Sequence, residues 1–201
     1  MINFDYLTLK AFVEENIDFL IDSRLQKIQQ PTRRDFIFSF RSRQGGKKMY
    51  VNINPSFFHV CFLNDETMKR RDITFPKQPP MFCMLLRKHI EGAKVLDIRV
   101  PYYERILEID FKSSNEFDEN INLTLAIEMM GKYSNVILYN SDTKIILGCA
   151  HNVGSEKSRE REVAGTLPYV YPPEQKYKKD ILRYNGEINY ETLNQDFLGI
   201  S

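Results

Sequence analysis

Cysteine is scarce in this 201-residue sequence, and its few copies are poorly placed for a disulfide framework. Cys61, Cys83 and Cys149 are odd in number, far apart and set among apolar neighbours, a pattern typical of small buried side chains in a reducing compartment. Long apolar runs are also missing, since none approaches the roughly 20 residues that span a bilayer. The N-terminus lacks the basic start, apolar run and cleavage site of a signal peptide. We therefore expect a cytoplasmic protein.

A strong net charge is absent too, because 28 Lys and Arg residues face 27 Asp and Glu residues, which leaves +1 at pH 7. The whole molecule therefore creates no strong field for a polyanion. The basic residues are nevertheless bunched in short clusters, at 41–48, 68–71, 87–89, 157–161 and 176–179. Each cluster by itself is more often a solvated loop than a binding site, whereas several on one face would favour an anionic partner.

Motifs for catalysis and metal binding are missing as well. The sequence contains no CxxC or HxxxH spacing for a metal, no GxSxG elbow for acyl transfer, and neither a Walker loop nor a GxGxxG turn for a nucleotide. Cys83 and His89 fall on one expected helix but on either side of its apolar stripe, which favours a structural thiol over a nucleophile. We predict no metal, no cofactor and no enzymatic activity.

Apolar residues are present in two clear periods. The first segment carries one stripe at helical spacing, with Asp5 as the expected N-cap; the stripe is formed by Leu9, Phe12, Val13, Ile17 and Leu20. From residue 24 the period changes to two, with alternation over 36–40 and 49–53 on either side of Gly45 and Gly46. This pattern predicts an N-terminal helix and then a β-hairpin, which a third strand at 57–62 extends.

The stretch PPMFCMLLRKHIEG, residues 79–92, interrupts this β run. Pro80 suits the first turn of a helix and Gly92 its C-terminal end. At 100° per residue an apolar face forms opposite Arg87 and Lys88, and we expect that basic pair to point outward. The apolar face contains Phe82, Leu85, Leu86, His89 and Ile90.

Further strands follow the inserted helix, with expected bounds of 94–100, 105–111, 121–129, 135–140 and 143–148. Many strands with two helices predict an α+β protein, mainly an antiparallel β-sandwich or barrel with an N-terminal helix and one inserted helix. From about residue 149 the pattern loosens, and prolines in GTLPYVYPP prevent continued sheet. We assign residues 1–175 to one β-rich domain and 176–201 to a linker and the start of a truncated second module.

The expected strand at 105–111 raises a question about charge. Arg105 falls on the face of Leu107, Ile109 and Phe111, yet an unpaired charge is too costly to bury. We therefore expect Arg105 at the rim of the sheet, held by a carboxylate and aimed outward, although a plain structural ion pair explains it equally well. Glu128 is expected on the polar face of its own strand.

Four ordered motifs resemble one known family. PPMFCMLLRKHIEG, YERILEIDF, IEMMGKYSNVIL and REVAGTLPYVYPP resemble the N-terminal domain of NFACT proteins, which include bacterial RqcH, also called FbpA or fibronectin-binding protein, and eukaryotic NEMF. The resemblance implies that 1–175 is an NFACT-N domain and that 176–201 begins a helix-hairpin-helix module. It also implies a fold similar to the N-terminal domain of formamidopyrimidine-DNA glycosylases. Those enzymes use a proline after the initiator methionine, whereas this chain has Ile2.

The resemblance implies a ribosome-associated quality-control factor. Such proteins bind the large ribosomal subunit carrying a stalled peptidyl-tRNA, recruit a further tRNA that is alanyl in bacteria, and support template-free tailing of the nascent chain. The domain is then expected to bind tRNA and rRNA without catalysis. The alternative is a surface adhesin that binds fibronectin, which the family name suggests and the missing signal peptide argues against.

The resemblance also implies which residues contact RNA. The family's Asp-Arg pair corresponds to Glu104 and Arg105, a change that lengthens the acid by one methylene. A guanidinium positioned by a carboxylate can hold a phosphate or base edge in a bidentate contact. Further expected RNA contacts are Glu128 and Arg161 of the later motifs, Arg159 of the basic cluster at 157–161, and Arg87 and Lys88 of the inserted helix.

Overall fold

The computed structural model describes residues 4–101, 103–114, 119–154, 156, 161–173, 178–179, 183–198 and 200. Its helices are α1 (Tyr6–Leu20), α2 (Asp65–Arg70), α3 (Met81–Ile90), the 3-10 turn η1 (Gly131–Tyr133) and α4 (Leu193–Asp196). Its strands are β1 (Arg24–Thr32), β2 (Asp35–Ser42), β3 (Gly45–Asn52), β4 (His59–Leu63), β5 (Lys94–Arg99), β6 (Ile106–Ser114), β7 (Asn120–Glu128), β8 (Asn135–Asn140) and β9 (Ile146–Cys149).

The strands form one nine-stranded antiparallel sheet in the order β4-β3-β2-β1-β5-β6-β7-β8-β9. β1 and β5 pair only at their first residues, Arg24 opposite Lys94, so the two halves of the sheet diverge from that point. Their inner faces share a single core, in which Phe36, Phe38 and Met49 of one half meet residues such as Leu107 and Leu125 of the other. The expected α+β sandwich is therefore confirmed.

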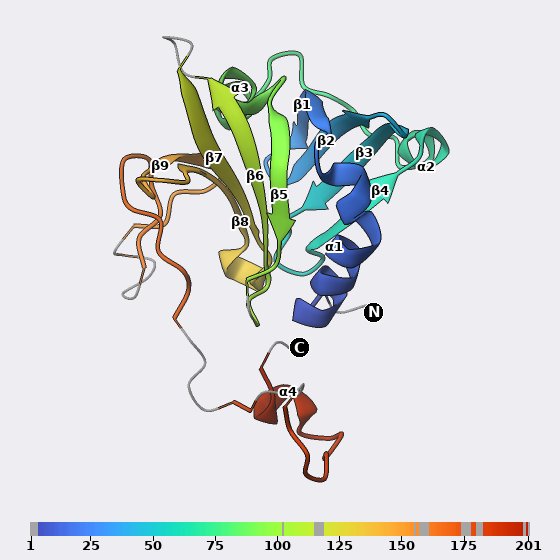
Figure 1. The fold of residues 1–201 in the computed structure, drawn as a ribbon, viewed down its shortest axis with the longest axis vertical. Helices are drawn as coiled ribbons and strands as arrows, with labels where there is room; N and C mark the ends of the chain where they lie inside the picture. The colour runs from blue at the N-terminus through green and yellow to red at the C-terminus, as the bar shows by residue number, and fades with distance from the viewer. Residues whose placement is uncertain are drawn as a thin grey trace.

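The two long helices close the sandwich. α1 begins where predicted, with the Asp5 carboxylate accepting a hydrogen bond from the Thr8 N–H at 2.9 Å, and it packs on β2, β5 and β6. α3 packs on β1, β6 and β9 and buries Cys83, Leu86 and Ile90. The structural role predicted for the Cys83 thiol agrees with this burial. Figure 1 shows α3 at the upper end of the β-body and α1 along one side.

A second layer covers the outer face of β6, β7 and β8. It consists of residues 161–173, which we call the strap. Bridges between Ile145 and Pro168 and between Val153 and Val163 tie the strap to the residues on either side of β9. A second core lies beneath it, formed by Ile106, Ala126, Ile137, Tyr139, Ile146, Val163 and Tyr169. The sequence predicted Glu128 on a polar strand face, and the structure shows that the strap buries Glu128 there.

Several elements differ from the sequence prediction. β1 was not assigned to residues 24–32, and α2 falls where only a basic cluster was noted. The strand expected at 143–148 begins later, at Ile146. Beyond the strap the described residues include the short helix α4, drawn below the β-body in Figure 1. The domain boundary near residue 175 stays a prediction.

Candidate nucleic-acid interface

Loops from both halves of the sandwich meet at one end of the β-body. The Arg34 carbonyl oxygen accepts a hydrogen bond from the Ile53 N–H at 2.8 Å, and the Arg105 carbonyl oxygen accepts one from the Met129 N–H at 2.8 Å. The Arg105 guanidinium lies 5.8 Å from the centroid of the Phe58 ring, which joins the halves. We call this region the loop end; it comprises residues 33–34, 53–58, 103–105 and 129–134. In Figure 1 its position is marked by η1, the yellow turn beneath the label of β8.

Arg105 lies half-buried at the loop end, immediately before β6. A hollow of about 60 Å³ opens beside it, and its described lining consists of Tyr103, Glu104, Arg105, Met130, Pro172, Pro173 and Ile200. Tyr103 has a φ of 59°, a left-handed conformation that is costly for a bulky side chain, and its ring packs 5.1 Å from that of Tyr6. The chain is therefore held in an unusual turn as it presents Glu104 and Arg105.

The charge of Arg105 is poorly solvated. Burial lowers the pKa of its guanidinium, and the negative charges of Glu104 and Asp5 oppose that shift. The expectation of a rim position is confirmed, but the expected carboxylate clasp is not, because the described residues hold no ion pair between Glu104 and Arg105. A guanidinium that has lost part of its hydration without a close counter-ion is well suited to an incoming phosphate.

Glu128 and Arg161 form a buried ion pair beneath the strap. Arg161 donates through both terminal nitrogens to the Glu128 carboxylate, at 3.0 and 2.6 Å, and the Tyr169 hydroxyl donates to the same carboxylate at 3.0 Å. Glu128 is 1% exposed. Both residues were predicted to contact RNA, but the fold encloses Glu128 completely. Glu128 can therefore affect the interface only indirectly, by holding the strap in position.

A second buried carboxylate, Glu108, has partners that the sequence did not suggest. It accepts hydrogen bonds from the hydroxyls of Tyr139 at 2.9 Å and Tyr171 at 2.7 Å. Arg99 Nη2 lies 2.8 Å from the other Glu108 oxygen, and Arg99 also pairs with Asp110. The signal available in the sequence was an acidic residue between Leu107 and Ile109 in an expected strand.

The two buried carboxylates together fix the strap. The rings of Tyr139 and Tyr169 stack with centroids 4.3 Å apart, which links the Glu108 group to the Glu128 group. Burial raises the pKa of Glu128, while Arg161 and Tyr169 oppose that shift and the charge of Glu108 adds to it. Because the strap ends in Pro172 and Pro173, which line the hollow beside Arg105, these buried groups also shape the loop end.

The basic pair on α3 lies away from Arg105. The Arg87 Nε–H donates to the Ile28 carbonyl oxygen at 2.8 Å, and its Nε lies 3.9 Å from Glu91 Oε2, so the side chain is held against β1 and is not free as expected. Lys88 is exposed. In Figure 1 α3 and η1 lie at opposite ends of the β-body. Arg159 falls outside the described residues.

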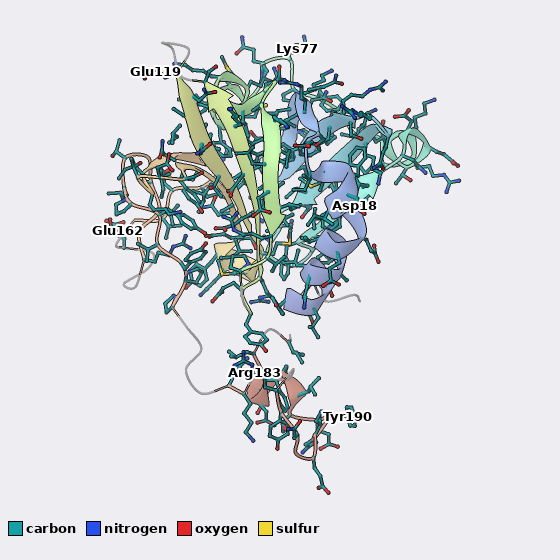
Figure 2. The ribbon with its side chains drawn as sticks, in the orientation of Figure 1. Asp18, Lys77, Glu119, Glu162, Arg183 and Tyr190 are labelled. Carbon is teal, nitrogen blue, oxygen red and sulfur yellow. The ribbon has the colours of Figure 1, made fainter. Side chains whose placement is uncertain are left out.

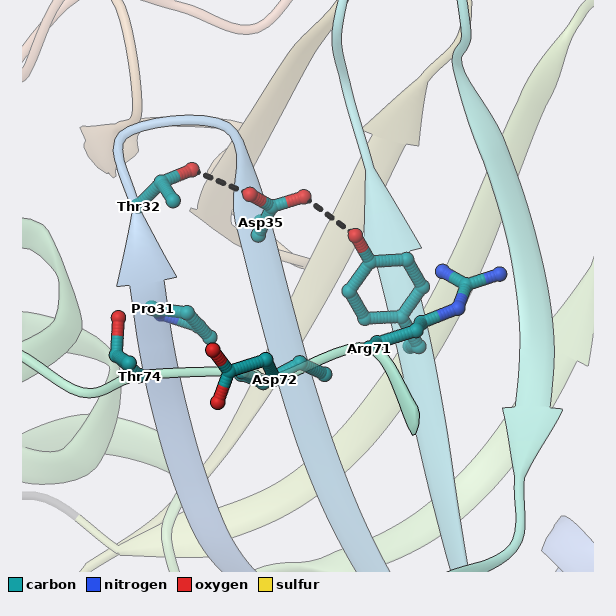
Figure 3. A pocket seen from close by; sticks show the side chains of 8 residues that line it. Pro31, Thr32, Asp35, Arg71, Asp72 and Thr74 are labelled. Carbon is teal, nitrogen blue, oxygen red and sulfur yellow. Dashed lines mark hydrogen bonds between the residues drawn. The ribbon is translucent and has the colours of Figure 1, made fainter. Parts of the chain in front are cut away.

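A hollow of about 440 Å³ opens beside β2 and β3 (Figure 3). The Asp35 carboxylate accepts hydrogen bonds from the Tyr50 hydroxyl and the Asn52 side-chain amide, each at 2.6 Å. The Arg71 guanidinium lies 5.0 Å from the centroid of the Tyr50 ring, and Asp72 adds a second carboxylate to the lining. With two acids and one cation this hollow is poorly suited to a phosphate.

The described ranges contain neither a metal-binding cluster nor a helix that could span a membrane. No group of three or more His, Cys, Asp and Glu side chains is placed there to hold a metal ion. Every described helix is too short or too polar to cross a bilayer.

Comparison with known sequences identifies similar proteins. The family model for NFACT N-terminal and middle domains matches residues 5–197. The Rqc2 homolog RqcH of Bacillus subtilis (strain 168) is 30% identical over 210 residues, covering 99% of this chain and 36% of the relative. The Rqc2 homolog RqcH of Streptococcus pneumoniae serotype 2 is 32% identical over 171 residues, covering 85% and 30%. The chain thus spans about a third of the length of these curated relatives.

Solved structures give a matching result. The N-terminal domain of fibronectin-binding protein PavA from Streptococcus pneumoniae superposes with a TM-score of 0.85 at 29% identity, covering 99% of this chain and 76% of that one. The N-terminal part of the fibronectin/fibrinogen-binding protein from Streptococcus suis gives a TM-score of 0.87 at 29% identity, with the same coverage. The fold described above is therefore shared with both proteins.

Proposed function

This chain belongs to the family of NFACT N-terminal and middle domains, whose model matches residues 5–197, and on that premise we propose that it is the RNA-binding domain of a ribosome quality-control factor. Its partners are a tRNA and the large ribosomal subunit that carries a stalled peptidyl-tRNA. Its role is to position the tRNA, while peptide-bond chemistry belongs to the ribosome. The similarity to proteins named Rqc2 homolog RqcH supports the quality-control assignment.

The single observation that carries the proposal is the state of Arg105. Its guanidinium is half-buried at the loop end, burial lowers its pKa, and the neighbouring charges of Glu104 and Asp5 oppose that shift. A phosphate or a base edge would supply the missing acceptors in bidentate geometry. The hollow beside it is only about 60 Å³, which fits one small group of a larger ligand rather than a separate metabolite.

A pull-down tests the proposal directly. The tagged full-length protein is recovered from a lysate with stalled translation, and the associated RNA is sequenced. We expect tRNA and large-subunit rRNA with the wild type, and a loss of about tenfold or more of the tRNA with Arg105→Gln, because a charge-assisted contact is removed. Lys77→Gln is the matched control, since Lys77 is exposed and lies at the upper end of the β-body in Figure 2. Equal tRNA recovery from all three proteins would contradict the proposal.

A second candidate function is fibronectin binding, which the names of the two similar structures favour. It requires the protein on the outer cell surface. Cell fractionation with an antibody against the chain distinguishes the two functions, because the quality-control role predicts co-sedimentation with large ribosomal subunits. Surface exposure together with saturable capture on immobilised fibronectin would favour adhesion instead.

A further inference from the structure

A larger hollow, of about 430 Å³, lies next to the Arg105 site. Met130 lines the small hollow, whereas the residues that follow it line the larger one, so η1 stands between the two. The side chains that matter for its chemistry come from the β1–β2 turn, η1, β8 and the segment after β9; they are Arg34, Lys132, Tyr133, Asn135, His151 and Asn152.

Local contacts shape the wall that η1 contributes. Gly131 has a φ of 58°, a conformation that glycine adopts without strain, and the Met130 N–H donates to the Ser134 hydroxyl at 2.9 Å. Asn135 fixes the opposite wall, because its side chain donates to the His151 carbonyl oxygen at 2.8 Å and accepts from the His151 N–H at 3.1 Å. A ligand would therefore enter a site that is already formed.

The exposed groups of this hollow suit an anion attached to a flat ring. Arg34 and Lys132 are exposed cations, and the described lining includes no carboxylate, in contrast to the hollow of Figure 3. The Tyr133 side chain is 47% exposed, with Lys132 Nζ 4.9 Å from its ring centroid. A cation beside a solvent-facing aromatic ring is the combination that binds the phosphate and the base of an unpaired nucleotide.

We propose that this hollow binds one unpaired nucleotide of the RNA that Arg105 contacts. Arg34 and Lys132 hold its phosphates, and the base stacks on Tyr133, with the Asn152 side chain available for a hydrogen bond to the base edge. The inference rests on the RNA-binding function proposed above, and it adds a base-stacking site on the far side of η1. The two sites then grip one strand at neighbouring positions.

Titration of labelled tRNA with the full-length protein over a range of salt concentrations tests the hollow. Tyr133→Ser should weaken binding about tenfold through the lost base stacking and leave the salt dependence unchanged, whereas Tyr133→Phe should bind as the wild type does. The Arg34→Gln, Lys132→Gln double variant should lower the slope of log affinity against log salt by between about 1 and 2. Phe75→Ser is the matched control for the ring, since Phe75 is 44% exposed, and Lys77→Gln is the control for charge.

Photocrosslinking gives an independent readout. A tRNA carrying 4-thiouridine should crosslink to the peptide containing Tyr133 in the wild type and in the Phe75→Ser variant. If Tyr133→Ser binds as tightly as Phe75→Ser and no crosslink maps to η1, the hollow is not a nucleotide site. Arg105→Gln separates that failure from failure of the proposed function, because it still weakens binding in the first case and has no effect in the second.

Discussion

Glu128 is a buried carboxylate whose charge must be balanced by neighbouring groups. Its carboxylate is enclosed between β7 and the strap, and its charge is balanced by Arg161 with a further hydrogen bond from Tyr169. Removing one member of a buried pair costs more than the pair itself contributes, because the remaining charge has neither water nor a counter-ion. Removal of either residue alone should therefore destabilise the strap.

We predict that Arg161→Met lowers the free energy of unfolding by about 3–5 kcal/mol. The Glu128→Leu, Arg161→Met double variant should recover most of that loss, because no charge remains buried. Denaturant unfolding at neutral pH measures both. A single variant as stable as the wild type would show that the strap is not held by this ion pair.

The same variant should respond to pH in a definite direction. Burial already raises the pKa of Glu128 in the folded protein, and loss of Arg161 removes a group that opposes the shift. A carboxyl group with a raised folded-state pKa binds its proton more tightly when folded, so its contribution to stability is present at acid pH and is lost as the pH rises through the folded-state pKa. Arg161→Met should therefore become relatively more stable, compared with the wild type, as the pH falls below neutral.

At the level of elements, α3 is fitted closely to β9. An added Cβ at Gly148 would lie 2.7 Å from Leu85 Cδ1, a distance that forces the leucine or the helix to move. We predict that Gly148→Ala destabilises the protein by about 1–3 kcal/mol through overpacking. Gly154→Ala is the control, since nothing lies within 4 Å of its added Cβ. In a Leu85→Ala background the effect of Gly148→Ala on thermal unfolding should shrink, and an undiminished effect would contradict this reading of the contact.

The elements also show what local sequence does and does not encode. The alternating phenylalanines of β2 and the apolar stripe of α1 allowed both elements to be predicted, because each buries a single apolar face in the core. β1 was missed because Lys27, Gln29 and Pro31 interrupt its pattern and its pairing with β2 is irregular. The buried outer face was missed because the strap that covers it lies tens of residues later in the chain, and only tertiary contact turns Glu108 into a buried residue.

The candidate site could be predicted only in part, because it too depends on contacts between residues that are distant in the sequence. Arg105 was located by its charge in an apolar alternation, and its rim position followed from the cost of burying it. Its distance from α3 depends on how the half-sheets diverge beyond Arg24 and Lys94, which no local pattern specifies. Tyr133 lines its hollow together with Arg34, a residue from the other half of the sandwich, and the sequence does not indicate that the two lie close together.

At the scale of the whole molecule, the positions of the basic groups decide RNA binding more than their number does. With a net charge of +1 there is no general attraction for RNA, so position decides which cations contribute. Arg105, Arg34 and Lys132 belong to the loop end or its adjoining hollow, whereas Arg87 and Lys88 belong to α3 at the opposite end of the β-body in Figure 1. We therefore expect that a short RNA segment bound at the loop end contacts the first group and not the second.

We therefore predict that the Arg87→Ala, Lys88→Ala double variant changes tRNA affinity less than Arg105→Gln does. Loss of the hydrogen bond from Arg87 to the Ile28 carbonyl oxygen should make it somewhat less stable, by about 1 kcal/mol. Its thermal unfolding must therefore be measured alongside binding. A larger loss of affinity from the α3 pair would place the main RNA contact on α3 and not at the loop end.

The most direct measurement is the equilibrium affinity of the full-length protein for tRNA at low salt, compared between Arg105→Gln and the Lys77→Gln control. A partly desolvated guanidinium should bind a phosphate strongly, so Arg105→Gln should weaken binding between about tenfold and a hundredfold, with thermal unfolding unchanged. If both variants bind tRNA as the wild type does, Arg105 is not an RNA contact and the account of the loop end is wrong.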